Sequence, residues 1–514
     1  MKTISILLLT IPVSLTVSTG WAQTEDDFLK AYAPEAAKRR APEKQVKGSQ
    51  GVKPLSEGIL PGIQVPFSQK QERQNPPPPD RLIGKVKWGL SDDKIKEWNL
   101  EPNDCSNISQ MLEQSPLGLK YAWQSVDLAE FDYSPDTLKV LFFSGVRTLR
   151  LDDQTLVRLR KYVQDGGSIF FDSLAGSKHF TDSARAIGSR IFPERQWRRL
   201  PPDHPFYHMV TDIEKIKLVR HDGDQPVHDA IYIGSRAGII LSPFGMGPGW
   251  SRRAEREDFL QGIESARFYD NQSAQELGVN LAAYIVGYAE AGVVEGRPEI
   301  YGSVDDQTPS DEFVFAQIRH GDAWNVHPGA ARNMLLKLAR STSLRVNLKR
   351  RAITLGKDNL SDVPFLYLTG LDNFTFSQEQ RQQLKRFIED GGTLLINNGL
   401  GLASFHQSVE REFAAIFPDQ SFQTLPVEHP IFRALPNLPA RQVEYSPALQ
   451  MANIDLGDKP TLEGLTVNGA LRVIYSPYDM EGGWHTVDYP LFRGYSNLSA
   501  MHLGMNIITY VLTQ

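Results

Sequence analysis

The chain has 514 residues, of which 41% are hydrophobic and 23% charged, and its formal net charge is −6. This length exceeds what one compact core usually serves, so we expect two to four domains of ordinary globular composition. The slightly acidic balance excludes nucleic acid as an expected partner. Cys105 is the only cysteine, which excludes an internal disulfide and a cysteine-rich metal site.

The N-terminus has the order of a secretory signal peptide. "MK" precedes the apolar run "TISILLLTIPVSLTV" and then "STGWAQ", where Gly20 and Ala22 are small residues before a cut expected at Gln23. The apolar run of about 15 residues is shorter than the roughly 20 needed to span a bilayer. We therefore expect residues 1–22 to be a signal peptide and the mature protein to be periplasmic or secreted, without a transmembrane anchor.

Two segments have the composition of linkers. Residues 23–80 are polar and proline-rich and end in "NPPPPD", which predicts a disordered tether with a stiff end. A second break falls in "EGRPEIYGSVDDQTPSDE", and we place a linker at residues 293–311. The domains predicted between and after these breaks are residues 81–292 and 312–514.

These two domains are copies of one sequence. "LPPDHPFY" at Leu200 returns as "LPVEHPIF" at Leu425, and at this shift residues 145–205 align with 370–430 without a gap. Further matches keep the same order: "DGGSIFF" with "DGGTLLI", Trp98-Asn99 with Trp324-Asn325, "SPFGMGPGW" with "SPYDMEGGW", and "LGVN" with "LGMN". The chain is predicted to contain a tandem duplication.

Strand and helix patterns alternate within each copy. "KVLFFSG" and "PFLYLTG" are typical of strands buried on both faces, and an amphipathic stretch closed by Gly-Gly follows each of them. Next come a second buried strand, "SIFFD" or "TLLIN", and a hairpin that ends in "SP". "AQELGVNLAAYIVGY" and "AMHLGMNIITYVL" are terminal helices. Each copy is thus predicted to be a doubly wound α/β domain with an antiparallel hairpin extension.

The shared phrases resemble a known bacterial family. In each copy these are an early Trp-Asn, a helix-Gly-Gly-strand core, "FP…LPxxHP", a Gly-rich turn with Trp, and a final "LGxN…Y". They resemble domain of unknown function four-one-five-nine, once per copy. This family is placed in the class I glutamine amidotransferase-like superfamily, so the resemblance implies a flavodoxin-like fold and an exported bacterial protein. It implies no particular reaction.

Amidotransferases of this superfamily hold a cysteine nucleophile in a sharp strand-to-helix turn. The corresponding turns here are "FFDSLAG" and "LINNGLG", which place Asp172-Ser173 and Asn397-Asn398 at this position and contain no cysteine. The chain also has no Gly-x-Ser-x-Gly elbow. Glutamine amidotransfer is therefore not expected. Asp172 and Ser173 remain candidates for a catalytic group in the first copy only, and Asn397 and Asn398 are candidate ligand contacts.

The repeated His-Pro phrase has two interpretations. His204, beside Asp203, is a candidate general base for Ser173, and His429 is a candidate ligand contact. In the structural interpretation each histidine precedes a proline in the first turn of a helix and ties down backbone with a ring nitrogen. One His-acid pair per copy falls short of the three or four ligands of a metal site, so neither a metal nor a cofactor is expected.

"GMGPGW" at Gly245 is a glycine-rich turn but not a phosphate loop. It lacks Lys-Ser/Thr and is predicted to follow a hairpin strand without opening a helix. In one interpretation its tryptophan, Trp250, and its counterpart Trp484 lie over a surface, where with Tyr269 and Tyr495 they would stack on a sugar or clamp a partner. Aromatic rings of this kind are more often packed in a core, and that interpretation is favoured over a binding surface.

The sequence as a whole favours an exported, non-catalytic tandem protein that binds a ligand or a cell-envelope protein or glycan. The alternative is a hydrolase of envelope peptide or glycan, with Asp172, Ser173 and His204 active in the first copy alone.

Overall fold

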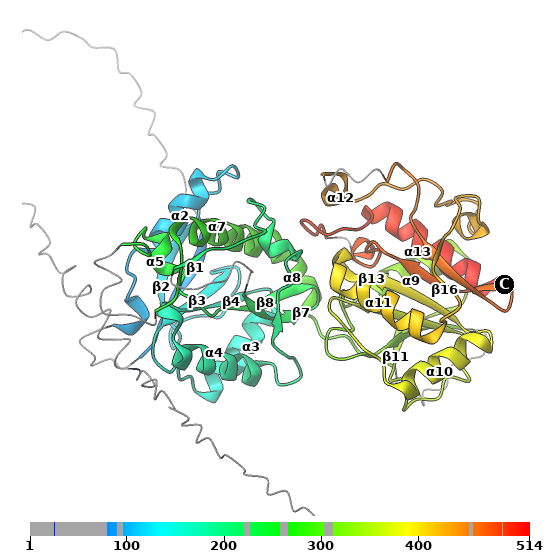
Figure 1. The fold of residues 1–514 in the computed structure, drawn as a ribbon, viewed down its shortest axis with the longest axis horizontal. Helices are drawn as coiled ribbons and strands as arrows, with labels where there is room; N and C mark the ends of the chain where they lie inside the picture. The colour runs from blue at the N-terminus through cyan, green and yellow to red at the C-terminus, as the bar shows by residue number, and fades with distance from the viewer. Residues whose placement is uncertain are drawn as a thin grey trace, which may run out of the picture.

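The computed structural model describes residues 25, 80–89, 96–219, 227–256, 266–302, 312–451, 456–485 and 487–513. The predicted signal peptide and all of the predicted first linker except its residues 25 and 80 lie outside this range. Two seven-stranded sheets follow one another along the chain, with helices packed on both faces of each (Figure 1). The mixed α/β class and the tandem arrangement are confirmed.

The first sheet has the strand order β2-β1-β3-β4-β8-β7-β5. The first five strands in this order run parallel, and β7 and β5 are antiparallel to their neighbours. Their bounds are β1 Arg81–Lys87, β2 Ala122–Asp127, β3 Val140–Gly145, β4 Ser168–Ser173, β5 Arg198–Arg199, β7 Asp229–Ile233 and β8 Arg236–Ser242. β6 (Leu218–Val219) and β9 (Phe268–Tyr269) form a separate small sheet.

Helices cover both faces of this sheet, which explains why every residue of β3 and β4 is buried. One core cluster joins one face to α2 and α7, and another joins the opposite face to α3 and α4. The helices are α2 Asp104–Gln114, α3 Asp153–Gln164, α4 Lys178–Ile191, α5 Gly247–Trp250, α7 Asn271–Gly287 and α8 Ala289–Glu295. The Asp152 side chain caps the N-terminus of α3. Gly166, with φ of 106°, lies just beyond the C-terminus of this helix, where the Gly-Gly pair predicted that the helix ends.

The second sheet repeats this arrangement as β11-β10-β12-β13-β16-β15-β14, with the last two strands antiparallel. Asn468 and Gly469 both have positive φ, 53° and 81°, in the β15–β16 turn, which is the conformation that Asn-Gly favours in tight hairpins. Its strands are β10 Phe313–Ile318, β11 Val346–Ile353, β12 Phe365–Gly370, β13 Thr393–Asn398, β14 Gln423–Thr424, β15 Glu463–Val467 and β16 Ala470–Ser476. Its helices are α9 Ala330–Ser341, α10 Gln378–Glu389, α11 Ala403–Ile416, α12 Pro447–Met451 and α13 Asn497–Leu512.

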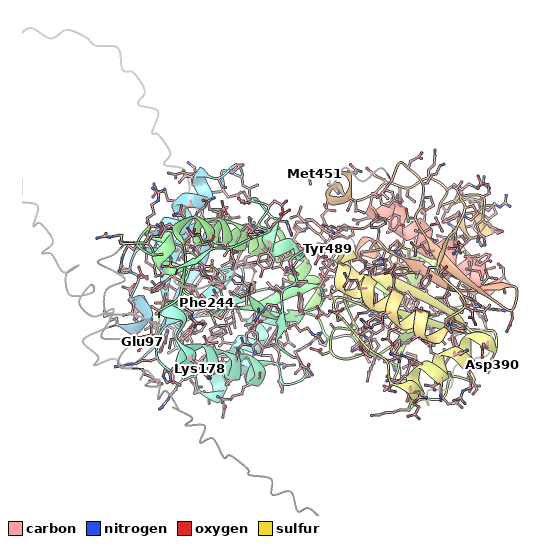
Figure 2. All side chains as sticks on the ribbon, in the orientation of Figure 1. Glu97, Lys178, Phe244, Asp390, Met451 and Tyr489 are labelled. Carbon is pink, nitrogen blue, oxygen red and sulfur yellow. The ribbon has the colours of Figure 1, made fainter. Side chains whose placement is uncertain are left out.

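The two domains share a packed interface. The core cluster around α7 continues into the second domain, and Tyr489 lies at the junction (Figure 2). The Tyr288 hydroxyl donates a hydrogen bond to the Pro490 carbonyl over 2.7 Å. Arg198 forms ion pairs with Asp322 and Asp372 of the second domain.

Part of the predicted second linker takes part in this interface. Residues 293–295 belong to α8, Glu299 pairs with Arg350, and residues 303–311 lie outside the described range.

In the part of the chain that the structure describes, no single helix is long and apolar enough to cross a membrane. The pair α7 and α8 meets the length and composition criteria jointly, but it is bent by 51°.

Candidate functional site

The sharp strand-to-helix turns lie two residues later than the sequence suggested. Asp172 and Ser173 belong to β4, and Asn397 and Asn398 belong to β13. The strained residues are Ala175, with φ of 57°, and Leu400, with φ of 55°. α/β-hydrolases hold their nucleophile at such a turn. Here the side chains at this position are hydrocarbon and have no attacking atom.

The three catalytic candidates do not converge. The Ser173 hydroxyl donates to the Ser177 carbonyl over 2.8 Å and accepts a hydrogen bond from the Thr181 hydroxyl. Asp172 accepts from the Met246 and Gly247 N–H groups at 2.9 and 3.1 Å. Neither side chain is hydrogen-bonded to His204. The structure therefore shows no serine triad among these residues.

His204 caps a turn through its ring nitrogen, as the structural interpretation of the His-Pro phrase expects. Its Nδ1 accepts a hydrogen bond from the Phe206 N–H at the start of a 3₁₀ turn, and the ring packs against Tyr232 and Tyr284. Complete burial lowers its pKa to about 3, so the ring is neutral. Asp203 accepts from the Ala403 N–H of the second domain.

His429 caps the corresponding turn of the second copy. Its Nδ1 accepts from the Ile431 N–H over 3.2 Å, and its ring packs edge-to-face against Tyr510. The same phrase thus makes the same cap in both domains.

The glycine-rich turn differs from the prediction, and its aromatic rings are buried. "GMGPGW" does open a helix, since Gly247–Trp250 forms the single turn α5. Trp250 and Trp484 are buried, and their indole N–H groups donate to the carbonyls of Ala274 and Ala500. Tyr269 and Tyr495 are also completely buried. The rings are therefore packed in a core, as the favoured interpretation expected, and do not lie over a surface. The tryptophans lie against α7 and α13, and the tyrosines stack on His228 and Tyr445.

Buried charges fill the carboxyl end of the first sheet. Lys85 of β1 forms an ion pair with Asp104, its Nζ lying 2.7 Å from both carboxylate oxygens, and neither side chain is exposed. The Asp172 carboxyl lies nearby. Burial raises its pKa to about 7, against the two backbone N–H groups that lower it.

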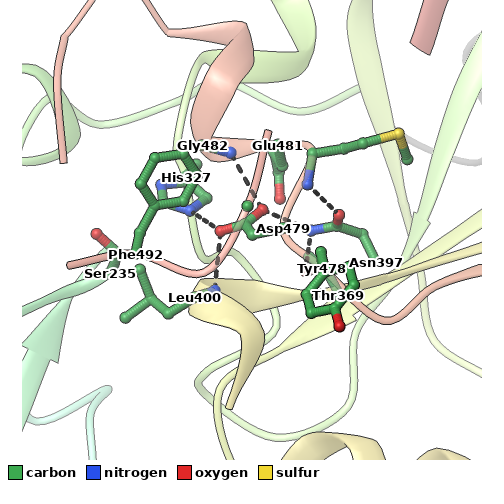
Figure 3. A network of polar contacts seen from close by, with 12 residues as sticks. Ser235, His327, Thr369, Asn397, Leu400, Tyr478, Asp479, Glu481, Gly482 and Phe492 are labelled. Atoms are coloured by element: carbon green, nitrogen blue, oxygen red, sulfur yellow. Dashed lines mark hydrogen bonds and ion pairs between the residues drawn. The ribbon is translucent and has the colours of Figure 1, made fainter. Parts of the chain in front are cut away.

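The second domain carries a different network at the same edge, and it reaches into the first domain (Figure 3). His327, just before α9, lies between Glu295 at the end of α8 and Asp479 in the turn after β16. Its Nδ1 is 2.8 Å from Glu295 and its Nε2 is 2.8 Å from Asp479, and all three side chains are buried. Burial alone would lower the pKa of His327, but the two carboxylates raise it to about 10. The ring is therefore an imidazolium between two carboxylates.

Asp479 is the centre of this network. Its Oδ1 accepts from the Asn397 amide at 2.9 Å and the Gly482 N–H at 3.1 Å. Its Oδ2 accepts from the Leu400 N–H and from His327, both at 2.8 Å. Burial raises the pKa of Asp479, but His327 and these donors outweigh it and hold the pKa below its ordinary value.

A second group of buried charges adjoins this network. Arg350 of β11 forms ion pairs with Glu299 and Glu481, and its guanidinium also donates to Gln317. The Tyr367 hydroxyl donates to Glu481 over 3.0 Å. Burial raises the pKa of Glu481 to about 7, even though Arg350 and His327 lower it.

The two domains place their carboxylate on different elements. Asp172 of β4 corresponds to Asn397 of β13, and each accepts a hydrogen bond from the methionine N–H that follows the hairpin. Gly245 corresponds to Asp479. The residue that forms the β-bridge to this position also differs between the domains. Gly245 is bridged to Phe268, and Asp479 is bridged to Gly494.

Sequence reasoning did not find Glu295, His327 or Asp479 as a group. The available signals were the replacement of Gly245 by Asp479 between the two copies and the histidine shortly after Trp324-Asn325. Among the described residues, no group of three or more His, Cys, Asp or Glu side chains is arranged to hold a metal ion.

Of the comparisons with known proteins, the one with protein-family models agrees with the duplication. Among curated proteins there is no match. A solved structure from Silicibacter pomeroyi DSS-3, described as a "putative phosphosugar isomerase", matches with 11% identity over 62% of this chain and 75% of that one, at a TM-score of 0.15. The model of a domain of unknown function, DUF4159, matches residues 83–286 and again residues 314–512. The chain therefore belongs to the DUF4159 family and contains the family's domain twice.

Proposed function

We propose that this protein is an exported, non-catalytic tandem module of amidotransferase-like domains that binds a ligand or a cell-envelope partner. One observation supports the proposal that the protein is not an enzyme. In both domains the strained turn that would present a nucleophile holds a hydrocarbon side chain, Ala175 or Leu400.

The fold supports the superfamily assignment within this proposal. The parallel strands have the order 2-1-3-4-5 in each domain, which is the flavodoxin-like order, and ligands of such sheets bind beyond the carboxyl ends of the strands. At this edge the chain's own buried charges satisfy one another. A ligand or partner is therefore expected on the outer surface.

Probe labelling tests the non-catalytic part. We expect no labelling of the mature protein by a fluorophosphonate, and an unchanged result for Ser173→Ala. A thiol probe should react with Cys105, which is completely buried, only after unfolding, and Cys105→Ala identifies that background. Stoichiometric fluorophosphonate labelling that Ser173→Ala abolishes would instead establish the hydrolase alternative.

Export and binding need separate measurements. Mass spectrometry of the protein from its native host should find Gln23 as the N-terminus, and a retained Met1 would contradict cleavage. Residues 23–514 should then co-sediment with purified cell-wall glycan or cross-link to one envelope protein in intact cells. Recovery of uncomplexed protein in both assays would contradict the binding part.

A further inference from the structure

Four buried donors in the second domain surround one carboxylate. They come from three stretches of chain: the Asn397 side chain and the Leu400 N–H from β13 and the strained turn after it, the Gly482 N–H from the turn of Asp479 itself, and the His327 ring (Figure 3). Each oxygen of Asp479 receives two of them. Two donors on each of two coplanar oxygens form the pattern that recognises a carboxylate, and the imidazolium supplies its countercharge.

The turn that carries Asp479 does not itself require a side chain. The first domain has Gly245 at this position, in a turn that makes the same bridge to a neighbouring segment. A Cβ on Gly245 would lie 3.1 Å from the Ala175 N atom and 3.1 Å from the Phe268 ring, so the first domain fills this space with an aromatic ring. In the second domain Gly494 stands at the position of Phe268, so no side chain at this position competes with the Asp479 side chain for space.

We propose that the second domain contains a carboxylate-binding site and that Asp479 occupies it as a ligand supplied by the chain itself. The ligand class is a small monocarboxylate, because the aspartate side chain has the shape of an acetate ion joined to the backbone. This inference goes beyond the proposed function and does not depend on it.

The surrounding charges restrict the site to one negative charge. Glu295 already binds the other side of His327, and Glu481 follows Asp479 closely in the same turn. A dianion such as sulfate or hydrogen phosphate would therefore add two negative charges beside Glu295, Glu299 and Glu481, which already share the two cations His327 and Arg350. Chloride has the charge but lacks the two oxygen positions.

Removing the side chain should open the site to free carboxylates. Asp479→Gly leaves room for acetate, and Asp479→Ala leaves a methyl group and room for formate. We expect the melting temperature of each variant to rise saturably by at least about 3 °C with its matching ion, at constant ionic strength set with chloride. Acetate should exceed formate for Asp479→Gly, and formate should exceed acetate for Asp479→Ala. The wild type should show no saturable response.

The control is His327→Gln added to each variant, which removes the cation and should abolish the carboxylate response. If a variant is unfolded in chloride alone, the same site should appear as carboxylate-dependent recovery of helical circular dichroism during refolding from urea. Equal effects of acetate, formate and chloride on both variants, folded or refolding, would overturn the proposal. So would a carboxylate response that persists without His327.

Discussion

Replacing His327 by glutamine should destabilise the protein strongly at neutral pH. The substitution leaves Glu295 and Asp479, both completely buried, without the cation between them. Breaking a buried ion pair by removing one partner costs about 3–5 kcal/mol. The rise in the pKa of His327 from 6.5 to about 10 gives a contribution of about 4 kcal/mol at pH 7, which agrees with that range.

The raised pKa of His327 also determines how the loss of stability in His327→Gln depends on pH. Because the pKa of His327 is raised in the folded state, its contribution is complete below the unfolded value of 6.5 and is lost as pH rises through about 10. The difference in unfolding free energy between the wild type and His327→Gln should therefore be largest at pH 6, fall to about 1–2 kcal/mol at pH 9, and nearly vanish above pH 10.

Urea unfolding, followed by tryptophan fluorescence and circular dichroism at pH 6, 7.5 and 9, measures this difference. The matched control is His208→Gln, which removes a histidine paired with Asp212 at the surface, where the side chains are 26% and 73% exposed. This control should cost less than about 1 kcal/mol. A cost for His327→Gln no larger than that of the control, or one that does not decrease with rising pH, would refute the reasoning.

Three further predictions concern other buried groups. Burial raises the pKa of Asp172 from 3.8 to about 7, so the stability that this group contributes is lost as pH rises from about 4 to 7. Asp172→Asn, which copies Asn397, should therefore lose about 2 kcal/mol less than the wild type between pH 5.5 and 8.5 in urea unfolding. The pKa of His204 is lowered to about 3, so the stability contributed by its neutral ring is lost as pH falls below 6.5. His204→Asn keeps an acceptor for the cap and should reduce the loss of unfolding free energy in acid by up to about 1.4 kcal/mol per pH unit. An unchanged slope of unfolding free energy against pH would contradict this. A Cβ on Gly249 or Gly483 would lie 2.3 or 2.4 Å from an alanine Cβ, so Gly249→Ala and Gly483→Ala should each cost about 1–3 kcal/mol in thermal unfolding, and a cost near zero would contradict the packing.

Local sequence patterns determined the repeating architecture. The buried strands, the helices closed by Gly-Gly, the Asn468-Gly469 turn and the His-Pro caps all depend on residues within a few positions of one another. Their physical causes are hydrophobic periodicity, positive φ and backbone capping, which a short window of sequence contains. The two copies also repeat these features in the same order, so the duplication could be identified before any tertiary contact was known.

The tertiary structure alone decided which polar groups meet. Glu295 and His327 are 32 positions apart, on opposite sides of the domain boundary, and His327 and Asp479 are 152 positions apart within the second domain. Nothing in the local sequence around any of them encodes a partner. Burial and charge depend on what the assembled elements place together, which is also why the tryptophans of the glycine-rich turns lie beneath α7 and α13. Short-range patterns specify elements, but the environment of a side chain arises only when distant elements pack.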